Sequence, residues 1–302
     1  MPAFTSSSCG LLLGLALVFG CGSTGSLGEP LAGAGTNASA GASTAGTSSG
    51  GAGAGSGAAP SGSAGLQLMS GGTTGGVTTT PEPECEGDQA LTALIRDFRG
   101  YDISDEEPRH PDFEGEFSGF KGLVQPTLGA DGTPTYAPAG GTVATTGPLE
   151  FAQWYHDVAN VNQRFEVQLP LQKDATRPGV FVYDNQDFFP IDGQGFDDGF
   201  AAHNFHFTTE LHFDFSYAGG ETFLFRGDDD VWVYINGDLV IDLGGVHPAD
   251  EASVSLDEQA ASLGIKPGAK YRMDIFQAER HTDFSTFRIE TSLRCIKNVV
   301  VK

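Results

Sequence analysis

The stretch from residue 204 to residue 217 alternates between apolar and polar side chains, and this feature constrains the fold most. The apolar positions share one parity: Phe205, Phe207, Leu211, Phe213, Phe215 and Tyr217. The polar positions share the other: His206, Thr208, Glu210, His212, Asp214 and Ser216. Successive side chains of a strand point to opposite faces, so the pattern predicts a strand with one buried face and one face in water. Such strands are typical of antiparallel sheets.

An Asn-Gly pair marks a hairpin. Val231–Ile235 and Leu239–Ile241 are apolar runs on either side of Asn236-Gly237. A type I′ turn needs a positive φ at both central residues, which Asn and Gly adopt most readily. Three further strands are predicted, the last two as a pair: Glu221–Arg226 with Phe223 and Phe225 facing inward, Lys270–Phe276, and Phe284–Leu293.

Helices are expected only as short segments, at Phe151–Val158 and Asp257–Leu263. Strands and helices do not alternate regularly along the chain, which argues against a doubly wound α/β fold. The sequence therefore predicts an all-β fold, mainly an antiparallel β-sandwich of about 200 residues with short helices.

The first residues have the features of an export signal. The apolar run Leu11–Phe19 is too short to cross a hydrocarbon core of ~30 Å as a helix, but it has the length of a signal-peptide core. We therefore assign residues 1–20 to a signal peptide. Gly20-Cys21 resembles the end of a bacterial lipobox, which predicts lipidation of Cys21 and an outer-membrane lipoprotein at the cell surface. The alternative is an ordinary secretory signal, with release of the protein and no special role for Cys21.

A low-complexity segment follows, over residues 21–84. It is rich in Gly, Ala, Ser and Thr and has too few large apolar residues to offset the entropy of ordering it. We expect a disordered tether with a mean reach of about 40–45 Å. The folded domain is then assigned to residues 85–302.

The charge of the chain is strongly acidic. It has 16 Lys and Arg against 39 Asp and Glu, a formal net charge of −23. Nucleic acids and anionic lipid surfaces are recognised by basic faces, so neither is expected as a partner, and contact with a membrane is expected only through the lipid anchor. An acidic chain favours cations instead, and Ca²⁺ prefers oxygen ligands.

Two cysteines bracket the predicted domain. Cys9 falls in the signal peptide and Cys21 at the lipid site, which leaves Cys85 and Cys295. In an oxidising compartment these two are expected to form a disulfide that ties the first segment to the last strand. Two buried free thiols are the alternative.

The densest acidic cluster is Asp228-Asp229-Asp230, between two apolar strands. Adjacent carboxylates repel one another, so they are expected at a strand end, where a cation can offset the repulsion. A solvated acidic turn is the alternative for such a triplet taken alone.

The surrounding residues resemble a known family. Residues 225–245 are similar to the protective-antigen (PA14) carbohydrate-binding domains. They contain two Asp, then a strand ending in Tyr-Ile-Asn-Gly, and then a strand with Val-Ile-Asp. The match extends to the narrower fibro-slime family over roughly residues 90–293. The shared motifs are HNFHFTTELH (203–212), DDDVWVYING (228–237), DLGGVH (242–247) and AERH (278–281). The resemblance implies an antiparallel β-sandwich.

The resemblance also implies a calcium site. The paired Asp228 and Asp229 would bind Ca²⁺, with an amide side chain and backbone carbonyls from a second loop. That loop corresponds to residues 279–283 and has no Asn, so Glu279 or Asp283 is expected to substitute for the amide. Sugar hydroxyls would complete the shell of six to eight oxygens that Ca²⁺ takes.

Several neighbours of this site are candidates for contact with a ligand: Asp230, Trp232, His247, Arg280 and His281. Trp232 can either stack on a sugar ring or pack under a loop. His247 and His281 are expected to hydrogen-bond a ligand rather than bind calcium, because imidazole prefers Zn and Cu. His206 and His212 are best explained as members of the polar strand face.

Three functions remain open. The first is a calcium-dependent carbohydrate-binding or adhesion module, tethered to the cell surface, with an extracellular polysaccharide as partner. The second is a secreted enzyme acting on glycosides, with two carboxylates from Asp112, Glu114, Glu210 and Asp214. The third is a structural matrix protein without a glycan ligand.

Overall fold

The computed structural model describes residues 87–102, 104–196 and 201–300. The predicted signal peptide (1–20), Cys21, the tether (21–84) and Cys85 lie outside these residues. Within the described part of the chain, no helix is long and apolar enough to cross a membrane. Cys295 is disulfide-bonded, but its pairing with Cys85 stays a prediction.

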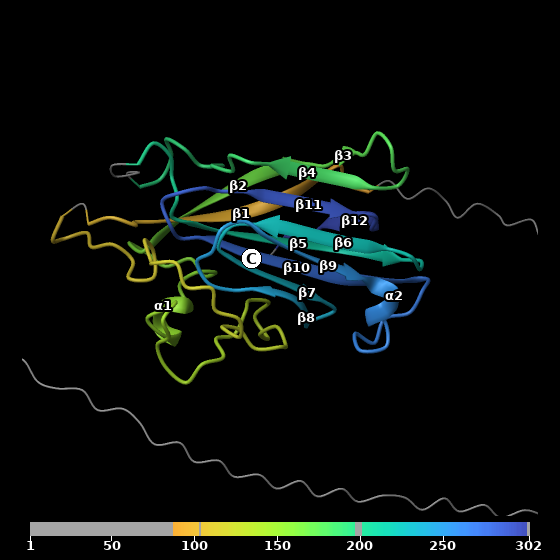
Figure 1. Cartoon of the computed structure of the whole chain (residues 1–302), viewed down its shortest axis with the longest axis horizontal. Helices are drawn as coiled ribbons and strands as arrows, with labels where there is room; N and C mark the ends of the chain where they lie inside the picture. The colour runs from red at the N-terminus through yellow and green to blue at the C-terminus, as the bar shows by residue number, and fades with distance from the viewer. Residues whose placement is uncertain (1–86, 103, 197–200, 301–302) are drawn as a thin grey trace, which may run out of the picture. The chain divides into compact units, whose positions relative to one another are not determined.

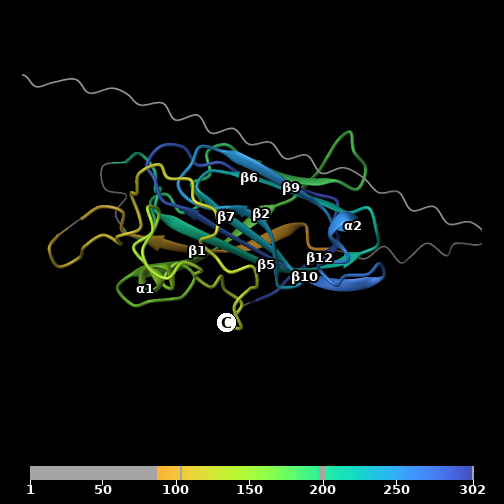
Figure 2. The ribbon, with the colours of Figure 1, turned by 60° about the horizontal axis from the view of Figure 1, so that its bottom comes forward.

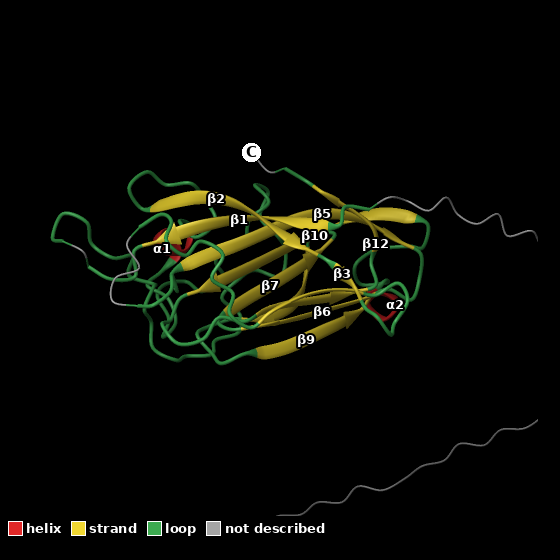
Figure 3. Ribbon diagram, turned by 90° about the horizontal axis from the view of Figure 1, so that it is seen from above, coloured by secondary structure: helices red, strands yellow, loops and turns green. Residues whose placement is uncertain are grey.

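Two antiparallel sheets form the domain, which confirms the predicted β-sandwich (Figures 1 and 3). The larger sheet has the order β2 (Asn162–Pro170), β1 (Ala90–Phe98), β5 (Phe207–Tyr217), β10 (Ala269–Glu279), β7 (Asp230–Ile235) and β8 (Asp238–Leu243), with β12 (Arg294–Asn298) also beside β5. The smaller sheet has the order β3 (Gln172–Lys173), β4 (Phe181–Asn185), β11 (Phe287–Thr291), β6 (Thr222–Gly227) and β9 (Asp250–Ser255).

The main core lies between the two sheets. The apolar positions of β5 face it, and so do Phe223 and Phe225 of β6, all as the alternation predicts. The hairpin of β7 and β8 also forms as predicted, with φ of 53° at Asn236 and 86° at Gly237.

The polar face of β5 is not in water, which corrects the sequence prediction. Thr208, Glu210 and His212 are buried, because the long segment between β1 and β2, with α1 (Pro148–Phe151), covers the outer face of the larger sheet (Figure 2). This cover forms a second core in which Phe113 and Trp154 pack against the sheet. The domain therefore has three layers: two sheets and a loop layer.

The predicted pairing of the last two strands is wrong. β10 lies between β5 and β7 in the larger sheet, whereas β11 lies between β4 and β6 in the smaller one. The connection between them spans seven residues, from Arg280 to Thr286, which lets the chain cross from one sheet to the other. This crossing brings the loop to one end of the sandwich.

The first predicted helix, Phe151–Val158, is wrong: α1 ends at Phe151, and the residues after it form turns. The second forms in part, because α2 covers Leu256–Gln259 rather than Asp257–Leu263. After α1, the side-chain amide of Asn162 donates to the carbonyls of Gln153 and His156, at 2.9 and 2.8 Å. These carbonyls therefore accept hydrogen bonds from Asn162 and not from the backbone N–H groups of a further helical turn, and the helix does not continue.

Candidate functional site at the rim of the sandwich

Three loops meet at the end of the sandwich where the chain crosses between sheets. They are residues 227–230, from the last residue of β6 to the first of β7; residues 244–247, after β8; and residues 279–286, from the last residue of β10 to the residue before β11. Together we call them the rim. The Asp228 N–H donates to the carbonyl of Thr286 at 3.4 Å, and the Asp229 N–H donates to the carbonyl of His247 at 3.2 Å. The fold thus brings together the two acidic segments that the sequence singled out.

Asp229 is held at the centre of the rim. Its Oδ1 accepts the backbone N–H of His247 at 3.2 Å, and its Oδ2 accepts the backbone N–H of Arg280 at 2.8 Å. Its φ is 51°, an uncommon backbone conformation that is typical of functional sites and tight turns. Burial raises the pKa of Asp229 to about 7, against the lowering effect of the Arg280 charge.

Asp230 and Arg280 form a buried ion pair, with 2.7 Å between Arg280 Nε and Asp230 Oδ2. Gly245 N–H donates to the other oxygen of Asp230 at 2.6 Å. Arg280 also donates to the carbonyls of Asp112 and Ala144. Neither partner has an exposed surface, so the expected contact of these two residues with a ligand is corrected: they stabilise the rim from within.

Glu279 and Asp228 are buried without such a partner. Both carboxylate oxygens of Glu279 and Oδ2 of Asp228 make no hydrogen bond. Burial raises the pKa of Glu279 well above its ordinary value, and the negative charge of Asp229 raises it further. Burial also raises the pKa of Asp228. Glu279 therefore lies where the missing amide was expected, while Asp283 is exposed.

The donor set of the rim fits a calcium ion, because it consists of carboxylate and carbonyl oxygens. As the side chains lie, no three His, Cys, Asp or Glu side chains of the described residues converge closely enough to hold a metal by themselves. A site here would therefore combine two carboxylates with backbone carbonyls. The oxygens of Asp228 and Glu279 that lack a hydrogen-bond partner are buried polar atoms, and a bound cation would satisfy them.

Trp232 packs under a loop, the second of its two predicted environments. It is fully buried in the second core, and its indole N–H donates to Asp242 at 3.1 Å. It has no exposed face for a sugar ring, which corrects its assignment as a ligand contact.

The two rim histidines differ. The His247 ring lies 2.9 Å from the carbonyl of Pro248 and 3.2 Å from that of Leu243. The His281 ring packs against Phe117, with 4.6 Å between the ring centroids, and its Nδ1 has no partner. Of the two imidazoles, that of His281 is the one with an unpartnered ring nitrogen, which is buried, and Phe117 beside it is 54% exposed.

The carboxylates considered for glycoside hydrolysis are all engaged elsewhere. Asp112 accepts the backbone N–H of Thr146 and the indole N–H of Trp154, and Asp214 pairs with Arg272; Glu210 pairs with Arg96. Glu114 accepts from His206 and Thr282, which together outweigh burial and lower its pKa to about 2.

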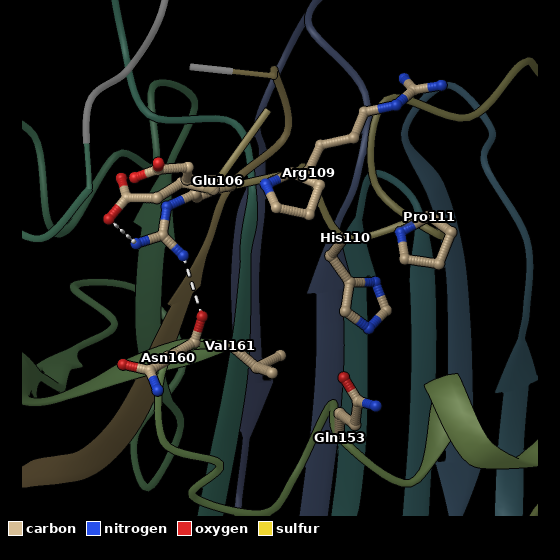
Figure 4. A pocket seen from close by; sticks show the side chains of 10 residues that line it. Glu106, Arg109, His110, Pro111, Gln153, Asn160 and Val161 are labelled. Carbon is tan, nitrogen blue, oxygen red and sulfur yellow. Dashed lines mark hydrogen bonds and ion pairs between the residues drawn. The ribbon is translucent and has the colours of Figure 1, made fainter. Parts of the chain in front are cut away.

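A cavity lies outside the rim, on the loop layer (Figure 4). It has a volume of about 410 Å³, and His110, Gln153 and Asn160 are among its lining residues. The Arg99 guanidinium in its wall already donates to the carbonyl of Asn160 at 2.9 Å and lies 3.6 Å from Glu107. None of the predicted site residues lines this cavity.

The sequence model of the PA14 domain family matches residues 152–299, which include most of both sheets and the whole rim. This part of the chain is therefore similar to a PA14 domain. The match begins inside the loop layer, so the earlier part of that layer and β1 lie outside the matched region.

Two proteins of Dictyostelium discoideum are similar in sequence to this chain. Protein psiR is 41% identical over 226 residues, which cover 70% of this chain and 22% of psiR. Protein psiD is 42% identical over 210 residues, which cover 63% of this chain and 40% of psiD. The matched region thus spans less than half the length of either relative.

Solved PA14 domains are similar at lower identity. The PA14 sugar-binding domain from an RTX adhesin is 10% identical, with a TM-score of 0.30, and the match covers 70% of this chain and 94% of that one. The PA14 domain of the MpAFP antifreeze protein is 12% identical, with a TM-score of 0.28, and the match covers 73% of this chain and 97% of that one.

Proposed function

We propose that the folded domain is a calcium-dependent carbohydrate-binding module of the adhesion type. One observation carries the proposal: Asp228, Asp229 and Glu279 are buried side by side, and burial raises the pKa of each carboxyl. Three of their oxygens have no partner within the protein. A divalent cation would supply the missing positive charge and accept the free oxygens as ligands.

The other residues of the rim prepare this site. Arg280 neutralises Asp230 and leaves Asp228 and Asp229 free for the ion. The backbone N–H groups of His247 and Arg280 fix the carboxylate of Asp229 from two sides. A bound calcium ion accepts the vicinal hydroxyls of a sugar as ligands. His281 would donate or accept a hydrogen bond beside them.

The similarity to PA14 domains supports binding rather than hydrolysis. A solved PA14 domain is described as a sugar-binding domain of an adhesin, and the same role is proposed for this chain. The carboxylates that a glycosidase would need are held in structural contacts instead, as Glu114 is by His206 and Thr282.

We further propose that the domain is displayed on the cell surface by a lipid on Cys21, with residues 21–84 as the tether. The basis is the sequence of residues 1–84. Cys21→Ser should move the protein from the membrane fraction to the medium. Wild-type protein found in the medium with a mature amino terminus other than residue 21 would support the secreted alternative and reject the anchor.

A glycan array read with calcium and with EDTA tests the proposed function. Wild type should bind at least one glycan only with calcium, and Asp228→Asn should lose that binding. Asp238→Asn is the matched control, because Asp238 starts β8 outside the rim and should change nothing. Binding that is equal in calcium and EDTA, or no glycan binding with no calorimetric heat for calcium, would reject the proposal.

A further inference from the structure

The edge strand β2 has a partner on one side only. Among the described residues it pairs with β1 alone, and it is the outermost strand of the larger sheet (Figure 3). The opposite edge of that sheet, at β8, is covered: the Leu239 N–H donates to the carbonyl of Pro126 at 2.8 Å, and the Leu128 N–H donates to that of Gly237 at 2.9 Å. An open edge of nine residues is a place where another strand can pair.

The even-numbered residues of β2 turn their backbone groups towards the open edge. The Leu171 N–H donates to the carbonyl of Gln89 at 2.8 Å, so in the register of β1 and β2 the odd-numbered residues of β2 bond β1. Residues that bond one neighbour alternate along a strand with residues that face the other side. The N–H groups of Arg164, Glu166 and Gln168 therefore face outward, and all three residues are exposed.

The side chains of this edge are complementary to themselves. Arg164 and Glu166 are two residues apart and so share one face of β2, while Phe165 between them packs half-buried against the main core. Glu166 forms no ion pair with another of the described residues. Arg164 contacts Asp157 through Nη1 alone, at 3.4 Å, so Nε and Nη2 remain for a second carboxylate.

One antiparallel register between two copies of β2 uses these charges. If Phe165 lies opposite Phe165 of the second copy, Arg164 of each copy lies opposite Glu166 of the other. Both of these residues are even-numbered, so their backbone groups face the partner and can exchange hydrogen bonds. Registers centred on Arg164 or on Glu166 would place like charges directly opposite each other, which is unfavourable.

We propose that β2 pairs with β2 of a second copy of this chain, in the antiparallel register centred on Phe165. The contact is isologous, since each copy contributes the same strand and the same charges. The two Phe165 side chains would lie in a non-hydrogen-bonded pair, where side chains approach most closely. The net charge of −23 opposes association, and one strand pair is small beside interfaces of ~1,200 Å² or more, so we expect a weak, reversible dimer.

Such a dimer would point its two rims in opposite directions. Asn162 at the start of β2 lies opposite Phe98 at the end of β1, beside the pair of Asp97 with Phe207. Phe207 in turn lies opposite Glu279 of the rim, so the rim is at the Asn162 end of β2. Antiparallel pairing places these ends far apart. Where the rims bind glycan as proposed above, the dimer would bridge two polysaccharide chains.

Sedimentation equilibrium of the full chain in EDTA tests this proposal. The chain carries Cys21→Ser, so that neither a lipid nor a disulfide at this residue joins two copies. We expect a reversible equilibrium between monomer and dimer. A chain that stays monomeric up to millimolar concentration would overturn the proposal.

Charge reversal tests the register. Arg164→Glu and Glu166→Arg should each weaken the dimer roughly ten- to hundredfold, because like charges then lie opposite each other twice. An equimolar mixture of the two variants should associate again, since two carboxylates of one chain then lie opposite two guanidinium groups of the other. Glu258→Arg changes the net charge as Glu166→Arg does, but at an exposed position on α2, and should dimerise at least as well as the unchanged chain.

The mixture separates this contact from any other. A single variant that dimerises without loss, or a mixture of folded variants that stays monomeric, would reject the pairing of β2. If thermal unfolding shows that a single variant does not fold, the double variant Arg164→Glu/Glu166→Arg takes its place. It should dimerise like the unchanged chain, and a folded double variant that stays monomeric would also reject the proposal. These results are obtained without calcium or glycan, so failure of the proposed function would leave them unchanged.

Discussion

Buried charge is arranged in opposite ways at the rim and on the outer face of the larger sheet. On the outer face, Arg96 lies between Asp157 and Glu210, and His212 Nδ1 lies 2.7 Å from Asp274. At the rim, Asp230 has the guanidinium of Arg280, but neither Asp228 nor Glu279 forms an ion pair with another of the described residues.

The pKa shifts show what this difference means. Burial would lower the pKa of His212, but its hydrogen bonds to Asp274 and Glu210 outweigh burial and raise it, so the charged pair is favoured. At the rim, burial and like charges raise the pKa of Glu279, so its neutral form is favoured. On the outer face, buried charges lie beside opposite charges and support the fold, whereas at the rim the charges of Asp228 and Glu279 have no such pairing.

The largest effect is expected from Arg280→Met, which removes the guanidinium that pairs with Asp230. Asp230 would then be a buried charge without a partner, at a cost of about 3–5 kcal/mol. Urea unfolding at neutral pH measures the loss. The double variant Arg280→Met/Asp230→Asn should recover a large part of it, because no uncompensated charge remains.

If the double variant is as unstable as Arg280→Met alone, the guanidinium acts mainly through its bonds to the carbonyls of Asp112 and Ala144. The rim would then be held by hydrogen bonds to the loop layer rather than by charge balance.

Glu279→Gln should have a smaller effect and should not destabilise the fold. In EDTA it removes what negative charge Glu279 still adds to the acidic cluster but leaves a buried amide of the same shape, so the free energy of unfolding should stay the same or rise slightly. Calcium should then stabilise wild type by ~2.7 kcal/mol at a hundredfold excess over Kd, and the variant by less. Thermal unfolding with calcium and with EDTA measures both.

A Glu279→Gln variant that is less stable than wild type in EDTA would contradict the comparison, because Glu279 would then contribute to the fold by itself. Glu116→Gln, at an exposed position, is the control and should respond to neither condition.

The alternation of β5 and the Asn-Gly turn predicted the sandwich, but the loop layer could not be predicted from them. Residues 99–161 have little regular secondary structure, so no periodicity shows that they cover a sheet. Their burial depends on scattered aromatic residues such as Phe113 and Trp154. For that reason, the polar face of β5 was expected to lie in water.

The sequence predicted that Asp228–Asp230 and residues 279–283 meet, but it predicted only in part what each of these residues does there. Adjacent residues of a strand face opposite sides, so Glu279 and Arg280, at the end of β10, could have been assigned to different surroundings. Which Asp the arginine neutralises depends on the pairing of β10 with β7, where Ala278 lies opposite Asp230. That register is set by the whole sheet rather than by the motif.

Acid titration of Glu114 tests whether paired charges stabilise the fold. The pKa of Glu114 in the folded protein is about 2, below its ordinary value of 4.5. Because the pKa is lower in the folded state, the ionised carboxylate stabilises the fold at pH values above about 4.5. This stabilisation is lost as the pH falls from about 4.5 towards about 2. Glu114→Gln should therefore be less stable than wild type at pH 6. The gap should shrink steadily as the pH falls below 4.5.

The measurement is the free energy of unfolding in urea between pH 3 and pH 6. A gap that stays constant over this range would mean that Glu114 acts through packing and not through its charge contact with His206.

The smallest effect is expected from an ion pair that lies in water. Arg272 Nε is 2.7 Å from Asp214 Oδ1, as close as Arg280 is to Asp230, but its side chain is 37% exposed and that of Asp214 is 45% exposed. A double-mutant cycle of Arg272→Ala and Asp214→Ala should give a coupling of about 0–1 kcal/mol, because water screens the pair. The coupling should fall further in high salt. Arg272 lies in β10 and Arg280 directly follows it, and both are equally distant from their partners, so the two measurements differ mainly in burial. A coupling at Arg272 as large as the loss at Arg280 would mean that burial does not set the strength of these pairs. The contrast between the rim and the outer face would then need another cause.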